Sequence, residues 1–215
     1  MLSITKSMSL VGLNGFLISV QVDVSGGLPS WELVGLPDTS IRESKERVKT
    51  AIKNSGFELD SRKIVINLAP ADIKKEGSFY DLPIAIGILV CIGVVNGENL
   101  NDTVLLGELS LDGSINKIDG VLPMCIEAKN LGIKKIIVPI ENASEASIVD
   151  GIEVLGAENL IQVVNYLNSN KDIPVFKTNI RDILNKENEY IYDFSEVKGQ
   201  ENIKRALEIS AAGRT

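Results

Sequence analysis

The stretch that decides the fold is NLAPADIKKEGSFYDLPIAIGILVCIGVV, from Asn67 to Val95. It begins in a short apolar strand, passes through a loop rich in proline, glycine and charge, and ends in an apolar run interrupted only by glycines. This pattern predicts a strand, a loop and a buried helix. Asp81 is the expected N-cap, because its carboxylate can accept backbone N–H bonds. Pro83 suits the first turn, where a backbone donor is not needed.

The apolar run after Pro83 is a core helix rather than a membrane span. It holds roughly 14 apolar residues, whereas a bilayer requires about 20. The first residues, MLSITKSMSLVGLNG, do not combine a cationic stretch, an apolar core and a small-residue cleavage site. We therefore expect no signal peptide, no membrane partner and a cytoplasmic protein.

Composition restricts the chemistry of the chain. The 215 residues carry a formal net charge of -7, which disfavours sequence-independent attraction to DNA, so we do not expect this chain to be the main contact if DNA is a partner. The chain has no histidine, which excludes a His-dependent catalytic triad. Its two cysteines, Cys91 and Cys125, fall in apolar helical patterns and outside any CxxC motif, so neither a zinc site nor another metal site is predicted.

The first third of the chain predicts three strands followed by an amphipathic helix. Alternating apolar residues and turn signals between Leu2 and Leu36 indicate an antiparallel meander. The period then changes to helical spacing after Pro37, with Asp38 and Ser40 as candidate caps, Ser40 and Glu43 as a possible capping box, and Glu43 able to pair with Arg47. We interpret the mixed charges on the outer face of this helix as solvated rather than as a nucleic-acid patch.

The rest of the first domain alternates between helices and strands, which predicts parallel pairing through crossovers. The expected strands are Ile64–Leu68, Thr103–Leu106, Glu108–Leu111, Lys135–Pro139 and Ile152–Leu155. The expected helices, besides the two already described, cover residues 121–131, Asn142–Val149 and Ala157–Leu167. The fold class is therefore mixed α/β, with an antiparallel front joined to a parallel back.

Composition divides the chain into a domain, a linker and a C-terminal segment. We assign residues 1–168 to one domain and residues 169–193 to a polar linker that is weakly helical around Ile180–Leu184. Helical periodicity returns in residues 194–215, which look like the beginning of another module.

Motif searches leave few catalytic options. The chain contains neither GxxxxGK[ST] nor GxGxxG, so nucleotide hydrolysis by these residues alone is not expected. The carboxylates Asp72, Glu76 and Asp81 surround the central loop, and we interpret them as caps and solvated loop charges rather than a metal or acid–base site. Ser78 in the loop and Lys117 in a later turn leave a Ser–Lys arrangement open at this point.

The segment LLGELSLDGSINKIDGVLPMCIEAKNLGIKKIIVPIEN, residues 105–142, resembles the proteolytic domain of Lon. The resemblance implies the fold that Lon's domain shares with the second domain of small-subunit ribosomal protein S-five. A gapless alignment from Gly107 places Lon's catalytic serine at Asp81 and its catalytic lysine at Met124. Neither side chain supplies the required hydroxyl or amine, so no catalytic residue is expected.

A second resemblance covers the whole chain. VGLPDTSIRESKERVKTAI, NLAPADIKKEGSFYDLPIAIGIL and DFSEVKGQENIKRALEISAAG are similar to motifs of the magnesium-chelatase-like AAA+ family, the YifB and ComM group. The resemblance implies that the ATPase module starts near residue 194 and that its Walker A loop lies beyond Thr215. It also implies that Val197, Lys198, Gly199 and Gln200 border the adenine of ATP. The full-length protein would use ATP and Mg²⁺, whereas this chain alone would hold no cofactor.

These resemblances lead to one expected function and two alternatives. The expected function is a non-catalytic accessory domain of a hexameric AAA+ motor that remodels DNA by helicase or branch-migration activity during natural transformation. Its partners would be the rest of the module and neighbouring subunits, with DNA bound elsewhere. The alternatives are a relic Ser–Lys peptidase that uses Ser78 and a magnesium-chelatase subunit in tetrapyrrole synthesis.

Overall fold

The computed structural model describes residues 1–59, 62–178 and 193–213. It contains two compact units, Met1–Asn179 (unit 1) and Ile180–Thr215 (unit 2), each of which is described by itself. The weak helix predicted around Ile180–Leu184 lies outside the described residues.

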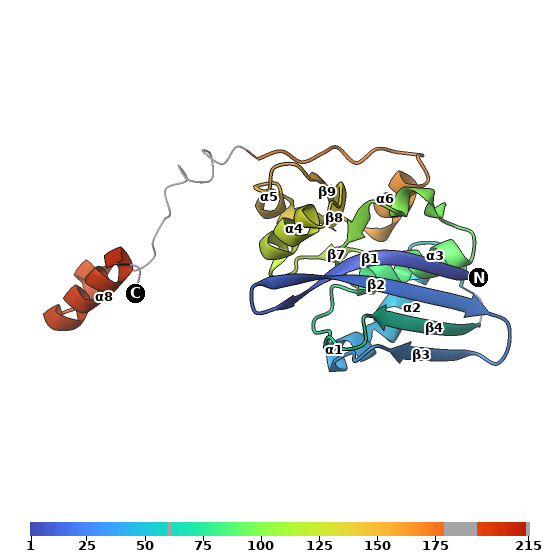
Figure 1. The fold of residues 1–215 in the computed structure, drawn as a ribbon, viewed down its shortest axis with the longest axis horizontal. Helices are drawn as coiled ribbons and strands as arrows, with labels where there is room; N and C mark the ends of the chain where they lie inside the picture. The colour runs from blue at the N-terminus through green and yellow to red at the C-terminus, as the bar shows by residue number, and fades with distance from the viewer. Residues whose placement is uncertain (60–61, 179–192, 214–215) are drawn as a thin grey trace. The chain divides into compact units, whose positions relative to one another are not determined.

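Unit 1 is built on one mixed sheet with strand order β3-β4-β2-β1-β5-β8-β9 (Figure 1). Its strands are β1 (Leu2–Val11), β2 (Asn14–Ser25), β3 (Ser30–Val34), β4 (Lys63–Ala69), β5 (Thr103–Leu105), β8 (Lys135–Pro139) and β9 (Glu153–Ala157). A small separate pair consists of β6 (Glu108–Leu109) and β7 (Ile115–Asn116). The predicted mixed α/β class is confirmed.

The N-terminal strands form a sheet, but not the predicted meander. β1 and β2 pair antiparallel as expected. β3, however, pairs parallel with β4, and β4 lies between β3 and β2. The connection from Ser25 to Ser30 can step over one strand, because its five Cα–Cα steps reach about 17 Å whereas two strand spacings need about 10 Å. The predicted meander was therefore wrong because a short loop does not guarantee pairing of the strands it connects.

The C-terminal half of unit 1 follows the predicted parallel pattern. β8 pairs parallel with both β5 and β9, and β5 also pairs parallel with β1. The helical crossovers are α4 (Val121–Asn130) between β7 and β8, and η2 (Ile140–Asn142) with α5 (Ala143–Ala146) between β8 and β9.

Two hydrophobic cores lie on opposite faces of this sheet. The first core contains Ile137, whereas its neighbours Ile136 and Val138 belong to the second core, because successive side chains of a strand point to opposite faces. The α-helices that bury residues in the first core are α1 (Thr39–Arg42), α2 (Ser44–Asn54), α3 (Asp81–Cys91) and α6 (Leu160–Leu167). α4 and α5 bury theirs in the second core.

α3 is the central helix of the first core, and each of its residues is buried. It ends at Cys91 rather than Val95, because Gly93 follows with a left-handed φ of 81°. Two hydroxyls of β1 hold it close to the sheet: Ser3 Oγ donates to the carbonyl of Gly87 at 2.8 Å and Thr5 Oγ1 to that of Pro83 at 3.0 Å. None of the described helices, α3 included, has the length and apolar character needed to cross a membrane.

The segment after α6 covers the edge strand β9. Ile173 is only 4% exposed and belongs to the first core. Val175 forms an antiparallel bridge with Leu155, and the N–H of Phe176 donates to the carbonyl of Val154 at 2.8 Å. The predicted linker 169–193 thus begins with residues that pack on unit 1, and its residues 179–192 lie outside the described part of the chain.

The described part of unit 2 contains a short helix η3 (Phe194–Glu196) and the helix α8 (Glu201–Gly213). None of the residues of α8 is buried. Its apolar side chains Ile203 and Leu207 are 56% and 50% exposed.

Candidate functional site

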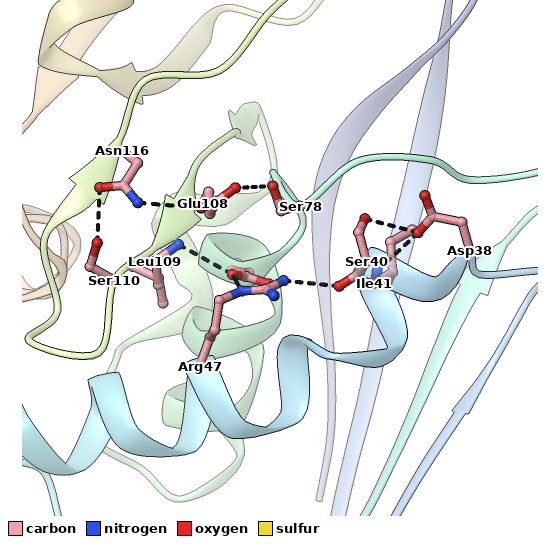
Figure 2. A network of polar contacts seen from close by, with 10 residues as sticks. Asp38, Ser40, Ile41, Arg47, Ser78, Glu108, Leu109, Ser110 and Asn116 are labelled. Atoms are coloured by element: carbon pink, nitrogen blue, oxygen red, sulfur yellow. Dashed lines mark hydrogen bonds and ion pairs between the residues drawn. The ribbon is translucent and has the colours of Figure 1, made fainter.

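The centre of the candidate site is an ion pair between Arg47 of α2 and Asp81, the first residue of α3 (Figure 2). Arg47 Nε donates to Asp81 Oδ2 at 2.6 Å and Nη2 donates to Oδ1 at 3.1 Å, so the contact is bidentate. Asp81 Oδ2 also accepts from the N–H of Leu109 at 3.3 Å, and Arg47 Nη2 donates to the carbonyl of Ser40 at 3.0 Å. The pair therefore joins α1, α2, α3 and β6.

Burial controls the electrostatics of this pair. The Asp81 side chain is fully buried, whereas the Arg47 side chain is 22% exposed. Burial raises the pKa of Asp81 to about 6, although Arg47 and the N–H of Leu109 act in the opposite direction. The hydrogen bond that Arg47 donates to Asp81 in turn raises the pKa of Arg47, which stays charged. The guanidinium therefore neutralises the carboxylate at the first residue of α3, and the N–H groups of Asp81 and Leu82 already donate to the carbonyls of Ser78 and Gly107.

Asp81 is not the predicted N-cap of α3. Tyr80 occupies that position and makes no side-chain capping bond, and the Asp81 carboxylate binds Arg47 instead. The prediction that Asp81 caps α3 is therefore wrong: its carboxylate forms an ion pair instead.

On the preceding helices the predicted Asp38 cap is confirmed, whereas the Ser40–Glu43 capping box and the Glu43–Arg47 surface pair are corrected. Asp38 caps α1 (Thr39–Arg42), since its Oδ1 accepts from the N–H of Ile41 at 2.9 Å and from Ser40 Oγ at 3.0 Å. Arg47 binds Asp81 rather than Glu43. Arg47 was assigned to the solvated face, although it lies three residues after the buried Ser44 and four before the buried Ala51. That helical spacing places Arg47 beside the buried stripe of α2, but it does not identify Asp81 as its partner.

A second set of polar contacts fixes the loop before α3. Ser78 Oγ donates to Glu108 Oε2, Asn116 Nδ2 donates to Glu108 Oε1 at 3.3 Å, and Ser110 Oγ donates to Asn116 Oδ1 at 2.9 Å (Figure 2). At the other end, the N–H of Gly77 donates to Asp38 Oδ2 at 3.2 Å. These bonds hold the loop against both the β6–β7 pair and the start of α1.

The structure does not bring together the Ser–Lys arrangement left open by the sequence. The hydroxyl of Ser78 is bonded to a carboxylate, and Lys117 is exposed in the turn before α4. Among the described residues, no hydrogen bond joins Ser78 and Lys117. A lysine base must be within hydrogen-bond reach of the serine it activates, so this geometry does not form a dyad.

The positions aligned with the Lon dyad are also separated. Asp81 begins a helix of the first core, whereas Met124 is buried in the second core on the opposite face of the sheet. The two positions that the gapless alignment assigns to Lon's serine and lysine, Asp81 and Met124, therefore do not belong to one site. Phe79 and Leu122, two residues earlier at the same spacing, both pack against the second core. Neither of these apolar side chains can serve as nucleophile or base.

The remaining loop carboxylates are not organised as a ligand set. Asp72 and Glu76 are exposed, and Glu76 accepts a hydrogen bond from Lys74. The described residues contain no group of three or more cysteine, aspartate or glutamate side chains placed to hold a metal ion.

Lys75, which the sequence analysis did not single out, is fully buried in this loop. Its Nζ donates to the carbonyl of Pro70, and burial lowers its pKa. No pattern in the sequence distinguishes it from its neighbour Lys74.

The predicted adenine border lies in unit 2. Val197, Lys198, Gly199 and Gln200 are all exposed, and Gln200 has a left-handed φ of 61°. Their role toward ATP stays a prediction.

Sequence comparisons relate the chain to several known proteins. The family described as subunit ChlI of Mg-chelatase matches residues 20–142. The chain is 35% identical to competence protein ComM of Haemophilus influenzae over 99% of this chain and 42% of that protein. It is 40% identical to the uncharacterized protein YifB of Escherichia coli over 99% of this chain and 41% of that protein. The chain therefore spans about two fifths of the length of these curated relatives.

A weaker match supports the predicted fold. The chain is 29% identical to Lon protease 2 of Bacillus subtilis over 75% of this chain and 32% of that protein. This match agrees with the Lon-like α/β fold predicted from residues 105–142.

Proposed function

The chain belongs to the family described as subunit ChlI of Mg-chelatase, and on that premise we propose that unit 1 is a non-catalytic accessory and interaction domain of a magnesium-chelatase-like AAA+ ATPase. The observation that carries this proposal is the state of the α3 N-terminus. The bidentate Arg47–Asp81 pair lies there, and the neighbouring Ser78 is bonded to Glu108. The loop therefore has a structural role, because its polar groups satisfy one another.

For the full-length protein we propose an ATP- and Mg²⁺-dependent hexameric motor that acts as a DNA helicase or branch-migration factor in natural transformation, in the cytoplasm. The likeness to a protein named competence protein ComM favours this choice. In this proposal DNA contacts the rest of the protein, because the net charge of -7 makes this chain a poor match for a phosphate backbone. Unit 1 instead contacts neighbouring subunits and the ATPase module.

A magnesium-chelatase subunit acting on a tetrapyrrole is the second candidate, favoured by the family description itself. The two proposals differ in the substrate of the full-length protein. ATP hydrolysis that rises with branched or single-stranded DNA supports the first proposal. Stimulation by a porphyrin and its chelatase partner subunits, without a DNA effect, would replace it with the second.

The proposed role of unit 1 is tested on the 215-residue chain. We expect no nanomolar binding of duplex or single-stranded DNA at physiological salt, measured by fluorescence anisotropy. We also expect no cleavage of casein, by wild type or by Ser78→Ala. Tight DNA binding would contradict the assignment of DNA to the rest of the protein, and cleavage that disappears in Ser78→Ala would restore the relic peptidase.

A further inference from the structure

The strand β3 forms an edge of the sheet that nothing in the described part of the chain covers. It pairs with β4 on one side only. The opposite edge, β9, is covered by the extended segment around Val175. Soluble proteins usually protect such an edge with lysine, proline or a covering segment, because its free N–H and C=O groups can pair with another strand. The only charged residue of β3 is Glu32, which lies 3.5 Å from Lys63.

Large apolar side chains are exposed along this edge. Leu28 before β3 is 89% exposed, Val34 at its end is 50% exposed, and Leu36 beyond it is 56% exposed. Val34 and Leu36 lie within the motif VGLPD, residues 34–38, and Leu28 lies in the loop before β3. The Arg47–Asp81 ion pair gives no reason for these apolar side chains to be exposed.

Leu36 is also held in a conformation that a branched side chain rarely adopts. Its φ is 54°, in the left-handed region. The backbone of Lys75 holds the flanking residues, since its N–H donates to the carbonyl of Leu36 at 3.2 Å and its carbonyl accepts from the N–H of Asp38 at 3.0 Å. The fold thus maintains a costly conformation that leaves an apolar side chain in solvent, and such costs accumulate at functional sites.

A depression close to β3 is lined by positively charged side chains, which favour an acidic partner. It has a volume of ≈ 720 Å³ and lies by the C-terminal half of α2, between Pro29 just before β3 and Ile64 of β4; its lining also includes Lys49, Lys53, Phe57 and Glu58. Lys49 Nζ lies 5.5 Å from the ring centre of Trp31. In the part of the chain that the structure describes, neither Lys49 nor Lys53 pairs with a carboxylate. This positive area contrasts with the net charge of -7.

From these observations we propose that the free edge of β3 binds an extended segment of a partner protein, which adds to the sheet as a further strand. The side chains of such a segment alternate between the two faces. Acidic residues on the α2 face would lie near Lys49 and Lys53, and apolar residues on the other face would pack near Val34. The partner is therefore an extended stretch that alternates acidic and apolar residues.

This inference rests on the proposal that unit 1 is an interaction domain, but its test is separate. Trp31 is the single tryptophan of the chain and lies at the second position of β3, so its fluorescence reports on the edge. A capped seven-residue peptide of alternating Glu and Val is titrated against the full 215-residue chain. We expect a saturable change in Trp31 fluorescence, slower amide exchange in residues 30–34, and binding that weakens as salt is added.

Charge and apolar contact are tested with separate variants. The double variant Lys49→Glu/Lys53→Glu should bind the peptide about tenfold more weakly, whereas the matched Lys129→Glu/Lys171→Glu should bind as wild type. Leu36→Gly should weaken binding without lowering the melting temperature, because glycine adopts positive φ without strain. That combination separates a binding role of Leu36 from a purely structural one.

Several outcomes would overturn the proposal. They are an absence of fluorescence and exchange changes up to the solubility limit of the peptide, equal binding of a Lys–Val peptide, or a concentration-dependent dimer whose β3 amides are already protected without peptide. The last result would assign the edge to a second copy of the chain. None of these results bears on the DNA-binding and casein experiments, so failure here leaves the proposed function intact.

Discussion

At the scale of single residues, Asp81 connects the sequence motif with the packing of unit 1. The Lon-like scaffold presents the start of a buried helix beside a polar loop, a position suited to an anion or a nucleophile. In this chain the position holds a carboxylate, and Arg47 neutralises it from a neighbouring helix. Substituting only one residue of such a pair leaves the charge of the other uncompensated in the protein interior, which destabilises the fold.

The raised pKa of Asp81 gives a prediction with a definite sign. Its pKa is about 6 in the folded chain and near 3.8 in the unfolded chain, so the folded state binds the proton more tightly. The contribution of Asp81 to stability is therefore fully present below about pH 4 and is lost as the pH rises through about 6. Between pH 7 and pH 4, wild type should gain up to about 3 kcal/mol in unfolding free energy relative to Asp81→Asn.

Urea unfolding followed by Trp31 fluorescence at several pH values measures this difference. Asp102→Asn is the matched control, because Asp102 is 58% exposed in its pair with Lys134. Between pH 7 and pH 4, wild type should show no comparable gain in unfolding free energy relative to Asp102→Asn. If wild type instead loses stability relative to Asp81→Asn on acidification, Arg47 outweighs burial and the pKa of Asp81 lies below its ordinary value.

The sequence pointed to two of the four residues that form the Arg47–Asp81 and Ser78–Glu108 contacts, and not to the other two. The motif and the helix start drew attention to Asp81 and Ser78, but their partners Arg47 and Glu108 come from elements distant along the chain. Charge alone predicted Arg47 to be solvated. Only a tertiary contact decides whether a charged residue beside a buried helical stripe faces solvent or a buried carboxylate.

At the scale of elements, local periodicity identified most strands and helices, and pairing was the main error. The parallel back was predicted because helix–strand alternation permits few arrangements. In the antiparallel front the place of β3 was predicted incorrectly, since the loop from Ser25 to Ser30 is equally compatible with direct pairing and with the insertion of β4. A period of two gives the faces of a strand but says nothing about its neighbours.

The segment that covers β9 gives a prediction at this scale. Ile173 lies in a stretch of polar composition, yet it is 4% exposed in the first core. Ile173→Ala should lower the unfolding free energy of unit 1 by about 2–4 kcal/mol, because it removes buried methyl groups and leaves a cavity. Val175→Ala is the control, since Val175 is 42% exposed, and it should cost less than half as much. Equal, small effects in urea unfolding would show that the segment does not stabilise unit 1.

At the scale of the whole molecule, the two units differ in how they are stabilised. Unit 1 encloses two cores around one sheet. The described helix of unit 2, α8, buries none of its residues, although it exposes Ile203, Leu207 and Ile209. Its amphipathic pattern was visible in the sequence, but a pattern indicates which face needs a partner without supplying one.

The last prediction concerns the exchange of backbone amides in α8. A helix of 13 residues with none of them buried within its own unit is marginal in water, because nucleation is costly and few hydrogen bonds compensate for it. In a dilute solution of the 215-residue chain, the amides of α8 should exchange near the rate of an unstructured peptide, whereas those of α3 should be protected close to the global unfolding limit. Hydrogen–deuterium exchange with mass spectrometry measures both in one experiment, with α3 as the internal control. Protection of α8 comparable to that of α3 in a monomer would contradict the prediction and would mean that its apolar face is covered. The same measurement on the full-length protein should show α8 protected, because the proposed ATPase module would then supply the missing packing.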